Sequence, residues 1–193
     1  MRIVAGRFRG AALDTPKSYD IRPTSDRVRE AIFNILAHGL GVSLEGARVL
    51  DLFAGTGAMG LEALSRGAAY VLFVEDNAEA RGLIRRNVET LGATGTTRIY
   101  RRDATKPGGP GTLRPFDVLF ADPPYGKGLA EKALAAAAAG GWLNPGAIAV
   151  VEERADVAFS APGGFVLADT RTYGDTAVYF LRLQDAAAPA SGV

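Results

Sequence analysis

The chain has 193 residues, of which 48% are hydrophobic and 22% are charged. This composition fits one globular domain and excludes an intrinsically disordered chain. The absence of cysteine excludes disulfides, cysteine-ligated metals and a thiolate nucleophile. The single histidine, His38, argues against a histidine-rich metal site and a histidine triad. The formal net charge is +1, and no apolar run is long enough for a signal peptide or a membrane span. We expect a soluble, cytoplasmic protein that binds neither a metal nor a membrane.

The first 29 residues are basic although the whole chain is nearly neutral. They contain seven basic and three acidic residues, whereas the remainder contains 15 basic and 18 acidic residues. A basic arm ahead of a slightly acidic body suggests that one end of the protein contacts a polyanion. The alternative is a solvated charged surface, and charge alone does not distinguish the two.

Residues 1–23 are predicted to form a β-hairpin and a linker that contact RNA. Short apolar runs at Ile3–Ala5 and Ala11–Leu13 flank the tip of this hairpin. The tip is basic and carries one aromatic ring, in the residues Arg7, Phe8 and Arg9. The Phe8 ring either stacks on a nucleotide or packs against the body of the protein.

Residues 24–184 are predicted to form one α/β domain of the Rossmann-like type. Apolar residues at helical spacing predict a helix over 25–38, with Thr24 as its N-cap. From residue 47, short apolar strands alternate with helices, which predicts a mostly parallel sheet with helices on both faces. The strands are expected at Val49–Ala54, Tyr70–Glu75, Thr97–Asp103, Phe116–Ala121 and Ala147–Glu152, and the helices at Ala58–Arg66, Asn77–Leu91 and Leu129–Ala139.

The C-terminal part of the chain departs from this alternation. Phe165–Ala168 and Ala177–Leu183 have no helix between them, so they are expected to close the sheet as an antiparallel pair. Residues 105–115 are rich in proline and glycine, and we expect them to be only weakly helical. Residues 185–193 are small and polar, and are expected to form a disordered tail.

A glycine-rich turn between the first strand and its helix predicts a ligand site. Gly55, Gly57 and Gly60 have the spacing of a dinucleotide-binding fingerprint, in which a ligand approaches the backbone closely and meets the amides of a helix N-terminus. Glu75 ends the next strand, where an acid binds ribose hydroxyls. Nicotinamide dinucleotides and S-adenosylmethionine both carry an adenosine, so this motif alone leaves both open.

The sequence Asp122-Pro-Pro-Tyr125 directly follows the fourth predicted strand. Two consecutive prolines make a rigid extended turn without backbone donors, so its carbonyl groups are left to accept hydrogen bonds. The acid before the prolines and the aromatic ring after them make a slot for a planar amine, because the carboxylate accepts from the amino group while the ring stacks on the base. This pattern favours an amino group on a nucleobase as the substrate.

The two motifs together resemble the class I methyltransferases that modify exocyclic amino groups. Further segments make the chain similar to the bacterial 16S ribosomal RNA guanine-N2 methyltransferases of the RsmD type, from about Met1 to Leu183. These segments are Arg2–Gly6, Arg22–Glu30, Gly60–Gly67 and Tyr173–Thr176. The resemblance implies S-adenosylmethionine as the cofactor and 16S ribosomal RNA in the small ribosomal subunit as the partner; we expect a monomer.

The resemblance also implies a role for each candidate site residue. The methionine part of the cofactor would be held by Asp51, Phe53, Gly55 and Gly57. Its ribose hydroxyls would bind Glu75, and its adenine would lie by Asp103 and Ala104. The target amine would be held by the catalytic residues Asp122, Pro123, Pro124 and Tyr125. RNA contacts are expected from Arg7, Phe8, Arg9, Arg22 and Thr24, of which the last two lie at the mouth of the site and have the alternative roles of a surface arginine and a helix cap.

Three other functions compete with this interpretation. A DNA adenine-N6 methyltransferase shares the site but usually carries a target-recognition domain, for which 193 residues leave no room. A nicotinamide dehydrogenase has no use for the Asp122–Tyr125 turn. An RNA-binding assembly factor without catalysis is disfavoured by the intact acidic residues Asp51, Glu75 and Asp122.

Overall fold

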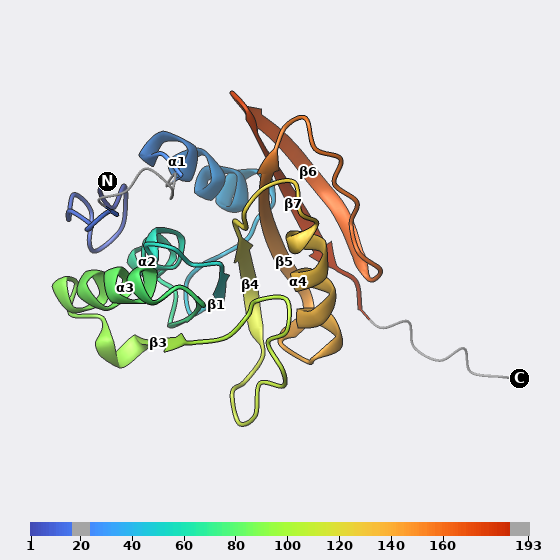
Figure 1. Ribbon diagram of the computed structural model, residues 1–193. Helices are drawn as coiled ribbons and strands as arrows, with labels where there is room; N and C mark the ends of the chain where they lie inside the picture. The colour runs from blue at the N-terminus through green and yellow to red at the C-terminus, as the bar shows by residue number, and fades with distance from the viewer. Residues whose placement is uncertain (17–23, 186–193) are drawn as a thin grey trace, which may run out of the picture.

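The computed structural model describes residues 1–16 and 24–185, and a seven-stranded sheet runs through it (Figure 1). The strand order is β3-β2-β1-β4-β5-β7-β6. The parallel strands are β1 (Arg48–Leu52), β2 (Tyr70–Val74), β3 (Thr97–Tyr100), β4 (Phe116–Ala121) and β5 (Leu143–Arg154). The strand β7 (Thr176–Leu183) is antiparallel to both β5 and β6 (Phe165–Tyr173). The mostly parallel sheet and its closing antiparallel pair are therefore confirmed.

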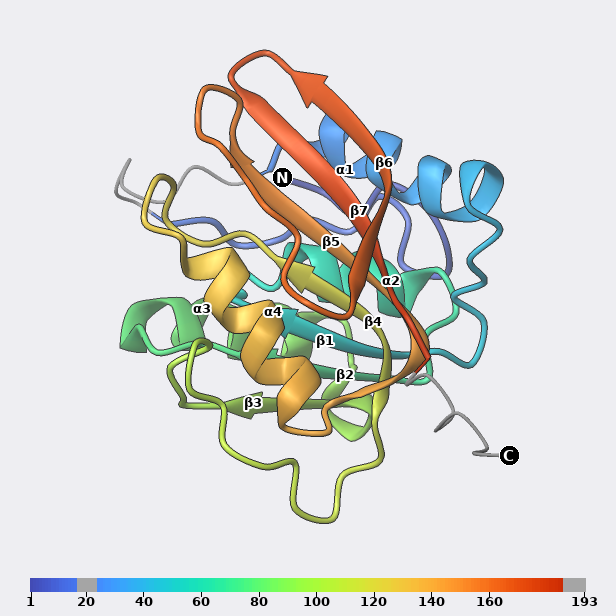
Figure 2. The ribbon, with the colours of Figure 1, turned by 90° about the vertical axis from the view of Figure 1, so that its right-hand side faces the viewer.

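Helices cover both faces of the sheet, but unequally (Figure 2). The helices α1 (Asp26–Asn34), α2 (Ala58–Ser65) and α3 (Ala78–Thr90) pack on one face, and α4 (Leu129–Ala139) packs on the other. Along β1, Val49 belongs to the core under the three helices and Leu50 to the core under α4, because neighbouring side chains of a strand point to opposite faces. A short 3₁₀ turn, η2 (Thr94–Thr96), leads from α3 into β3.

The N-terminal hairpin is present, but it is part of the core rather than a separate arm. Its ladder is reduced to one antiparallel bridge between Arg2 and Ala12. Ile3 and Leu13 are buried against the face covered by α1–α3. The hairpin of residues 1–13 therefore contributes to the hydrophobic core of the domain.

The start of α1 differs from the expectation, because Ser25 and not Thr24 is the N-cap. Ser25 has an extended backbone, and its hydroxyl accepts from Val28 N at 3.2 Å. The Thr24 hydroxyl instead donates to Glu152 on β5 at 2.8 Å. The α-helix is also shorter than predicted and continues as a π-helical turn, η1 (Ile35–Gly39).

The connection between β3 and β4 contains no helix, so the weakly helical expectation for residues 105–115 was wrong. Side chains hold its carbonyl groups instead: Trp142 Nε1 donates to Gly108 O at 2.7 Å, and Arg102 donates to Gly109 O at 3.3 Å. β3 is shorter than predicted, and β5 and β6 are longer.

Some predicted features lie outside the described residues. These are Arg22 and, apart from Asp185, the C-terminal tail. In the part of the chain that the structure describes, no helix is long and apolar enough to cross a membrane.

Candidate active site

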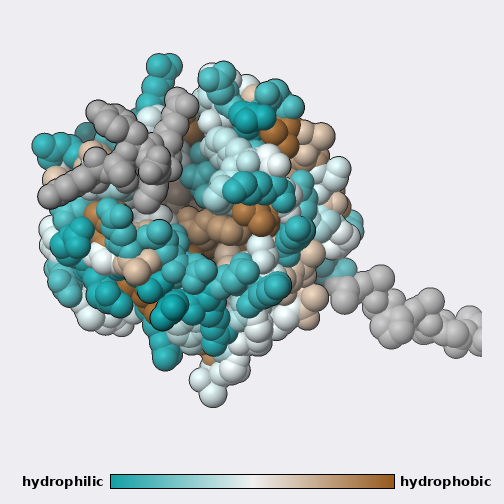
Figure 3. All heavy atoms as spheres, viewed as in Figure 1, coloured by the Kyte–Doolittle hydropathy of each residue, from teal (hydrophilic) through white to brown (hydrophobic). Residues whose placement is uncertain are grey.

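The C-terminal ends of the parallel strands bring the predicted acidic residues to one edge of the sheet. Asp51 lies near the end of β1, and Glu75, Asp103 and Asp122 follow β2, β3 and β4. Open α/β sheets bind their ligands at this edge. Figure 3 views the molecule from this edge, and hydrophobic residues line a hollow near the middle of the face.

The glycine-rich turn after β1 has the backbone of a ligand cradle. Gly55 and Gly57 have positive φ angles of 57° and 78°, which only glycine adopts without strain. A Cβ on Gly55 would have no neighbour nearer than Phe53 O at 3.9 Å, whereas one on Gly60 would lie 2.5 Å from the Phe73 ring. Open space at Gly55 therefore leaves room for a ligand, and Gly60 permits close packing of α2 on β2.

Phe53 is strained at the start of the same turn. Its φ is +55°, the only positive φ of a non-glycine residue among the residues described. Such strain costs about 1–3 kcal/mol and concentrates at binding sites. The strained residue Phe53 therefore lies in the same turn as the predicted site residues Gly55 and Gly57.

Two carboxylates hold this turn by accepting backbone amides. Asp51 Oδ2 accepts Gly60 N at 3.0 Å, and Glu75 Oε2 accepts Gly55 N at 2.9 Å. Glu75 Oε1 also accepts Asn77 N at 2.8 Å, so each oxygen keeps only one lone pair for a ligand. Burial, together with the charges of Glu75 and Glu152, raises the pKa of Asp51 to about 8, although the hydrogen bond from Gly60 N acts in the opposite direction.

Asp103 and Ala104 lie in the turn that follows β3. Asp103 is exposed, whereas Ala104 is buried. Both the amide and the hydroxyl of Thr105 donate to Asp103 Oδ1, at 2.8 and 2.7 Å. These bonds lower the pKa of Asp103 and leave its Oδ2 open. The hydrogen bonds from Thr105 therefore favour the ionised form of the Asp103 carboxylate and fix its orientation.

The Asp122–Tyr125 turn after β4 is supported by the neighbouring strand β5. Glu153 Oε1 accepts Gly126 N at 3.0 Å, directly after the turn. Pro123 is buried and Pro124 is exposed, so the two prolines differ in their surroundings. Burial and the nearby Asp122 charge raise the pKa of Tyr125, which remains a neutral phenol.

Glu152 is the site residue that the sequence analysis missed. Ala121 pairs with Val151 across β4 and β5, so the next residues, Asp122 and Glu152, lie side by side. Glu152 is only 5% exposed, and burial raises its pKa to about 7. The signal was the acidic pair that ends an otherwise apolar strand.

Asp51, Asp122 and Glu152 form a cluster of carboxyl groups, the acidic cluster. Burial, followed by the charges of Glu152, Asp51 and Glu153, raises the pKa of Asp122 well above its usual value. The Thr24 hydroxyl donates to Glu152, and its proximity to Asp122 lowers the pKa of that carboxyl in part. None of the three carboxylates forms an ion pair with a basic residue of the described chain.

This arrangement can accept hydrogen bonds from an amine and can stabilise a cation. It does not resemble a metal site, because residues 1–16 and 24–185 hold no group of three potential ligands arranged around a metal ion. A positive ligand charge would lower the raised pKa values of the cluster. The site therefore suits a cationic ligand next to a planar amine.

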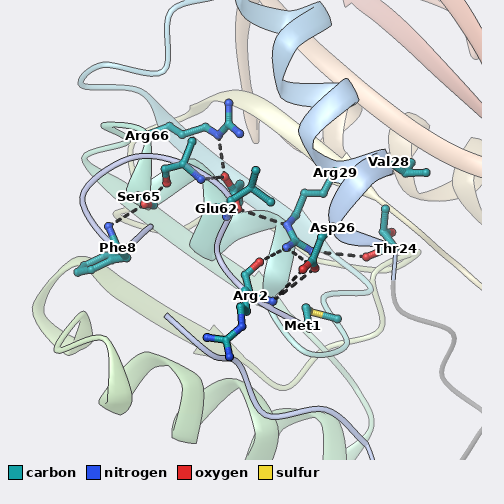
Figure 4. Close-up of polar contacts among 12 residues, drawn as sticks. Met1, Arg2, Phe8, Thr24, Asp26, Val28, Arg29, Glu62, Ser65 and Arg66 are labelled. Atoms are coloured by element: carbon teal, nitrogen blue, oxygen red, sulfur yellow. Dashed lines mark hydrogen bonds and ion pairs between the residues drawn. The ribbon is translucent and has the colours of Figure 1, made fainter. Parts of the chain in front are cut away.

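The predicted RNA-contacting residues do not all gather at this edge. Thr24 reaches the acidic cluster, whereas Arg7, Phe8 and Arg9 lie at the hairpin tip. Figure 4 shows Phe8 beside Ser65, at the end of α2. Arg7 N donates to Ser65 O at 2.9 Å, and the Arg7 guanidinium stacks 4.6 Å from the Phe8 ring centre. Phe8 is half-buried and packs against the core, which agrees with the second of the two expectations for this ring.

Comparison with known proteins then identifies the family. The family described as conserved hypothetical protein 95 matches residues 1–182. Ribosomal RNA small subunit methyltransferase D from Escherichia coli is 41% identical over 158 residues, which cover 81% of this chain and 76% of that protein. The chain belongs to the ribosomal RNA small subunit methyltransferase D family. The Haemophilus influenzae protein of the same name is 35% identical, over 90% of this chain and 89% of its own length.

Solved structures agree with this membership. A structure described as the methyltransferase yhhF from Escherichia coli superposes with a TM-score of 0.81 and 32% identity, and covers 95% of this chain and 98% of that one. The fold of the chain is therefore the Rossmann-like class I methyltransferase fold, as the sequence predicted.

One motif of the family resemblance has a structural explanation in this family member. Gly6 ends the hairpin segment Arg2–Gly6, and a Cβ there would lie 1.9 Å from Ser65 O. The Ala5 and Val4 amides donate to the buried carboxylate of Glu62 at 3.0 and 2.8 Å. The segment is thus fitted to α2, which explains why this sequence pattern accompanies the fold.

Proposed function

We propose that this chain transfers a methyl group from S-adenosylmethionine to the exocyclic N2 amine of a guanine in 16S ribosomal RNA. The observation that carries the proposal is the Asp122–Tyr125 turn, which lies beside buried Glu152 and next to the glycine-rich turn of β1. Membership in the family supports ribosomal RNA as the substrate, since its relatives in Escherichia coli and Haemophilus influenzae bear that name.

The residues at the glycine-rich turn fit S-adenosylmethionine. Open space at Gly55 admits the ligand, Glu75 keeps acceptor capacity for ribose hydroxyls, and Asp103 Oδ2 is open to the adenine amine. Ala104 is buried beside Asp103 and borders the same position. The acidic cluster complements a sulfonium charge, and the bound cofactor supplies an electrophilic methyl group on that sulfur.

In the transfer step, the chain orients the amine and receives its charge. The lone pair of guanine N2 is delocalised into the ring, so the amine is a poor nucleophile. Hydrogen bonds from the amine to Asp122 and to a carbonyl of Pro123 or Pro124 favour a more tetrahedral nitrogen, and Tyr125 stacks on the base. Transfer of the methyl group would leave the electrons of the broken S–C bond on sulfur, so these residues would have to orient the amine and take up one proton.

The positive charge that develops on the amine is stabilised by ionised carboxylates. Asp122 lies closest to the amine in this proposal and accepts the leaving proton. Glu152 shares the burial and the Thr24 contact with Asp122, so a proton on Asp122 relieves the repulsion between them. Thr24 is accordingly proposed to position these acids rather than to bind RNA alone.

Arg7, Arg9 and Arg22 are proposed as phosphate contacts that orient the substrate. Arg7 and Arg9 are exposed at the hairpin tip, and Phe8 supports Arg7 by stacking. Phosphate contacts fix the register of an enzyme on a nucleic acid but do not select the base. The selection of guanine is therefore assigned to the Asp122–Tyr125 turn.

The proposal is tested by incubating the protein with S-adenosylmethionine labelled in its methyl group. Small ribosomal subunits, naked 16S RNA and duplex DNA are offered separately, and the recovered nucleosides are analysed. We expect label in N2-methylguanosine from RNA and none from DNA. Label in N6-methyldeoxyadenosine from DNA would instead indicate the DNA enzyme, and RNA binding without any label would indicate an assembly factor.

A further inference from the structure

Six residues at the β3 end of the sheet form a surface that the proposed reaction does not use. We call it the arginine–tyrosine patch; it consists of Arg48, Tyr70, Arg98, Tyr100, Arg102 and Arg114. Arg98 and Arg114 are exposed, and the other four are half-buried. All lie on β1, β2, β3 or the connection between β3 and β4.

The strand register explains why these side chains share one face. Arg48 pairs with Tyr70, and Val74 pairs with Tyr100. Tyr70 and Tyr100 pack against the core on the α4 side of the sheet, and Arg98 points the same way because it lies two residues before Tyr100. The helix-free connection after β3 leaves this part of the face without a helix of its own (Figures 1 and 2).

The guanidinium groups in the patch stack on the aromatic rings. Arg48 lies 4.6 Å from the Tyr70 ring centre and 4.9 Å from that of Phe116. Arg98 and Arg102 lie 5.0 and 4.6 Å from the Tyr100 ring centre. Stacked arginines and tyrosines present flat surfaces together with positive charge.

The positive charge of the patch is not neutralised by ion pairs within the described chain. The ion pairs of the described residues involve other arginines: Arg29, Arg66, Arg86, Arg154 and Arg171. A neighbouring carboxylate, Asp117, accepts hydrogen bonds from Arg48 N and from the side chain of Asn144. Burial and the neighbouring charge of Arg114 lower the pKa of Arg48, so like charges have been brought together here.

We propose that the arginine–tyrosine patch binds single-stranded RNA next to the target base. This inference rests on the proposed function and adds a second contact surface to it. Arginines neutralise phosphates, and aromatic rings and guanidinium planes stack on unpaired bases. The patch reaches the end of β3, where Asp103 follows Tyr100, so RNA bound there continues toward the candidate active site.

The test compares two double variants that remove the same charge from opposite faces. Arg98→Gln with Arg114→Gln neutralises the patch, and Arg85→Gln with Arg86→Gln neutralises exposed positions of α3 on the other face. Binding to naked 16S RNA and to small subunits is measured over a range of salt concentrations. We expect the patch variant to bind RNA roughly tenfold or more weakly in about 0.1 M salt, with a salt slope shallower by about one to two. The α3 variant should bind like the wild type.

A third variant separates stacking from charge. Tyr100→Leu keeps an apolar side chain but removes the ring, and should weaken RNA binding roughly fivefold or more without changing the salt slope. Melting temperatures of all variants serve as the control for folding, and we expect those of the charge variants to stay close to the wild type.

Several outcomes would overturn the patch as an RNA site. They are equal loss of RNA affinity in both double variants, wild-type affinity and salt slope in the patch variant, or no RNA binding by the wild type. A variant that melts earlier but binds RNA normally would give the patch a stabilising role only. The proposed function has its own readout, because methyl transfer by the wild type to RNA can fail or succeed independently of these binding results.

Discussion

Two buried acidic regions of this domain are built in opposite ways. Glu62 on α2 is fully buried and pairs with fully buried Arg29 at 3.3 Å, while Arg66 donates to its other oxygen at 2.8 Å (Figure 4). The acidic cluster of Asp51, Asp122 and Glu152 has no ion-pair partner among the described basic residues.

The difference separates an acid that stabilises the fold from the acids of the candidate active site. Arg29 also donates to Asp26 Oδ1 at 2.9 Å and to the carbonyl of Arg2, so the Glu62 region ties the hairpin, α1 and α2 together. The acidic cluster instead has raised pKa values, because burial penalises its charges and no basic residue of the described chain pairs with them. The hydrogen bonds from Gly60 N and the Thr24 hydroxyl offset this only in part. We infer that a cationic ligand supplies the missing charge.

The largest expected effect is on the paired region. Glu62→Ala leaves the buried Arg29 with only the more exposed Asp26 as an acidic partner and removes the acceptor of two hairpin amides. Breaking a buried ion pair in this way costs about 3–5 kcal/mol, which urea unfolding measures. Glu89→Ala, at an exposed position of α3, is the control and should change the free energy of unfolding by less than about 0.5 kcal/mol. Equal stability of both variants would contradict the structural role of Glu62.

The contacts of Glu62 with the hairpin also decide how the proposed RNA contact of the hairpin tip can be tested. Deleting residues 1–13 removes Ile3 and Leu13 from the core as well as the partners of Glu62, so we expect it to lower the melting temperature and to impair cofactor and RNA binding together. The RNA role of the tip is better tested by Arg7→Gln with Arg9→Gln, which leaves the buried contacts intact. That double variant should weaken RNA binding and leave S-adenosylmethionine affinity unchanged.

The next largest effect is on the rate of methyl transfer and concerns Asp122 in the acidic cluster. Asp122→Asn keeps the size of the side chain but removes the charge that stabilises the developing ammonium. Loss of one such group costs about 10²–10³ in rate, and single-turnover methylation measures it. Asp156→Asn, at an exposed position, is the matched control. A rise in KM with unchanged kcat would show that Asp122 only binds the substrate.

A smaller effect is expected from a substitution in the acidic cluster, which should stabilise the protein instead of destabilising it. The folded-state pKa of Asp51 is raised to about 8, so the folded state binds a proton that the unfolded state has released above about pH 4. Stability therefore falls as pH rises from about 4 to about 8. Asp51→Asn retains an acceptor for Gly60 N, so it should raise the melting temperature at pH 8, with a smaller gain at pH 5. The same gain at both pH values would mean that the Asp51 charge is not the cause.

The smallest effect is proton release when the cofactor binds. The sulfonium of S-adenosylmethionine should lower the raised pKa values of Asp51 and Glu152 and release a fraction of a proton near pH 7.5. S-adenosylhomocysteine has no sulfonium charge and should release less. Calorimetry in two buffers of different ionisation enthalpy measures the number of protons that each ligand releases. Equal release by both ligands would mean that the sulfonium charge does not cause the release.

The sequence predicted the elements that depend on local pattern. The order of strands and helices follows from short apolar runs and helical spacing, and every strand predicted from residue 47 onward exists within a few residues of its predicted bounds. The two strands predicted for the N-terminal hairpin are reduced to one bridge. The wrong details are at ends and connections. Thr24 and Ser25 are both good caps, and the choice between them depends on Glu152, which is 128 residues away in the sequence. Residues 105–115 form no helix because their prolines and glycines disfavour one, and Trp142 and Arg102 bind two of their carbonyl groups instead.

The sequence alone determined the fold class, the glycine-rich turn, the Asp122–Tyr125 turn and the resemblance to the family, because these are carried by residues close together in the chain. Only the tertiary structure decided which charged side chains form ion pairs within the described chain and which do not. It pairs Arg29 with Glu62 and buries both, aligns Asp122 with Glu152 across two strands, and leaves the arginines around Tyr100 without ion pairs in the described chain. Net charge is a sum over residues, whereas burial and pairing depend on which distant segments meet, and only the folded chain fixes those meetings.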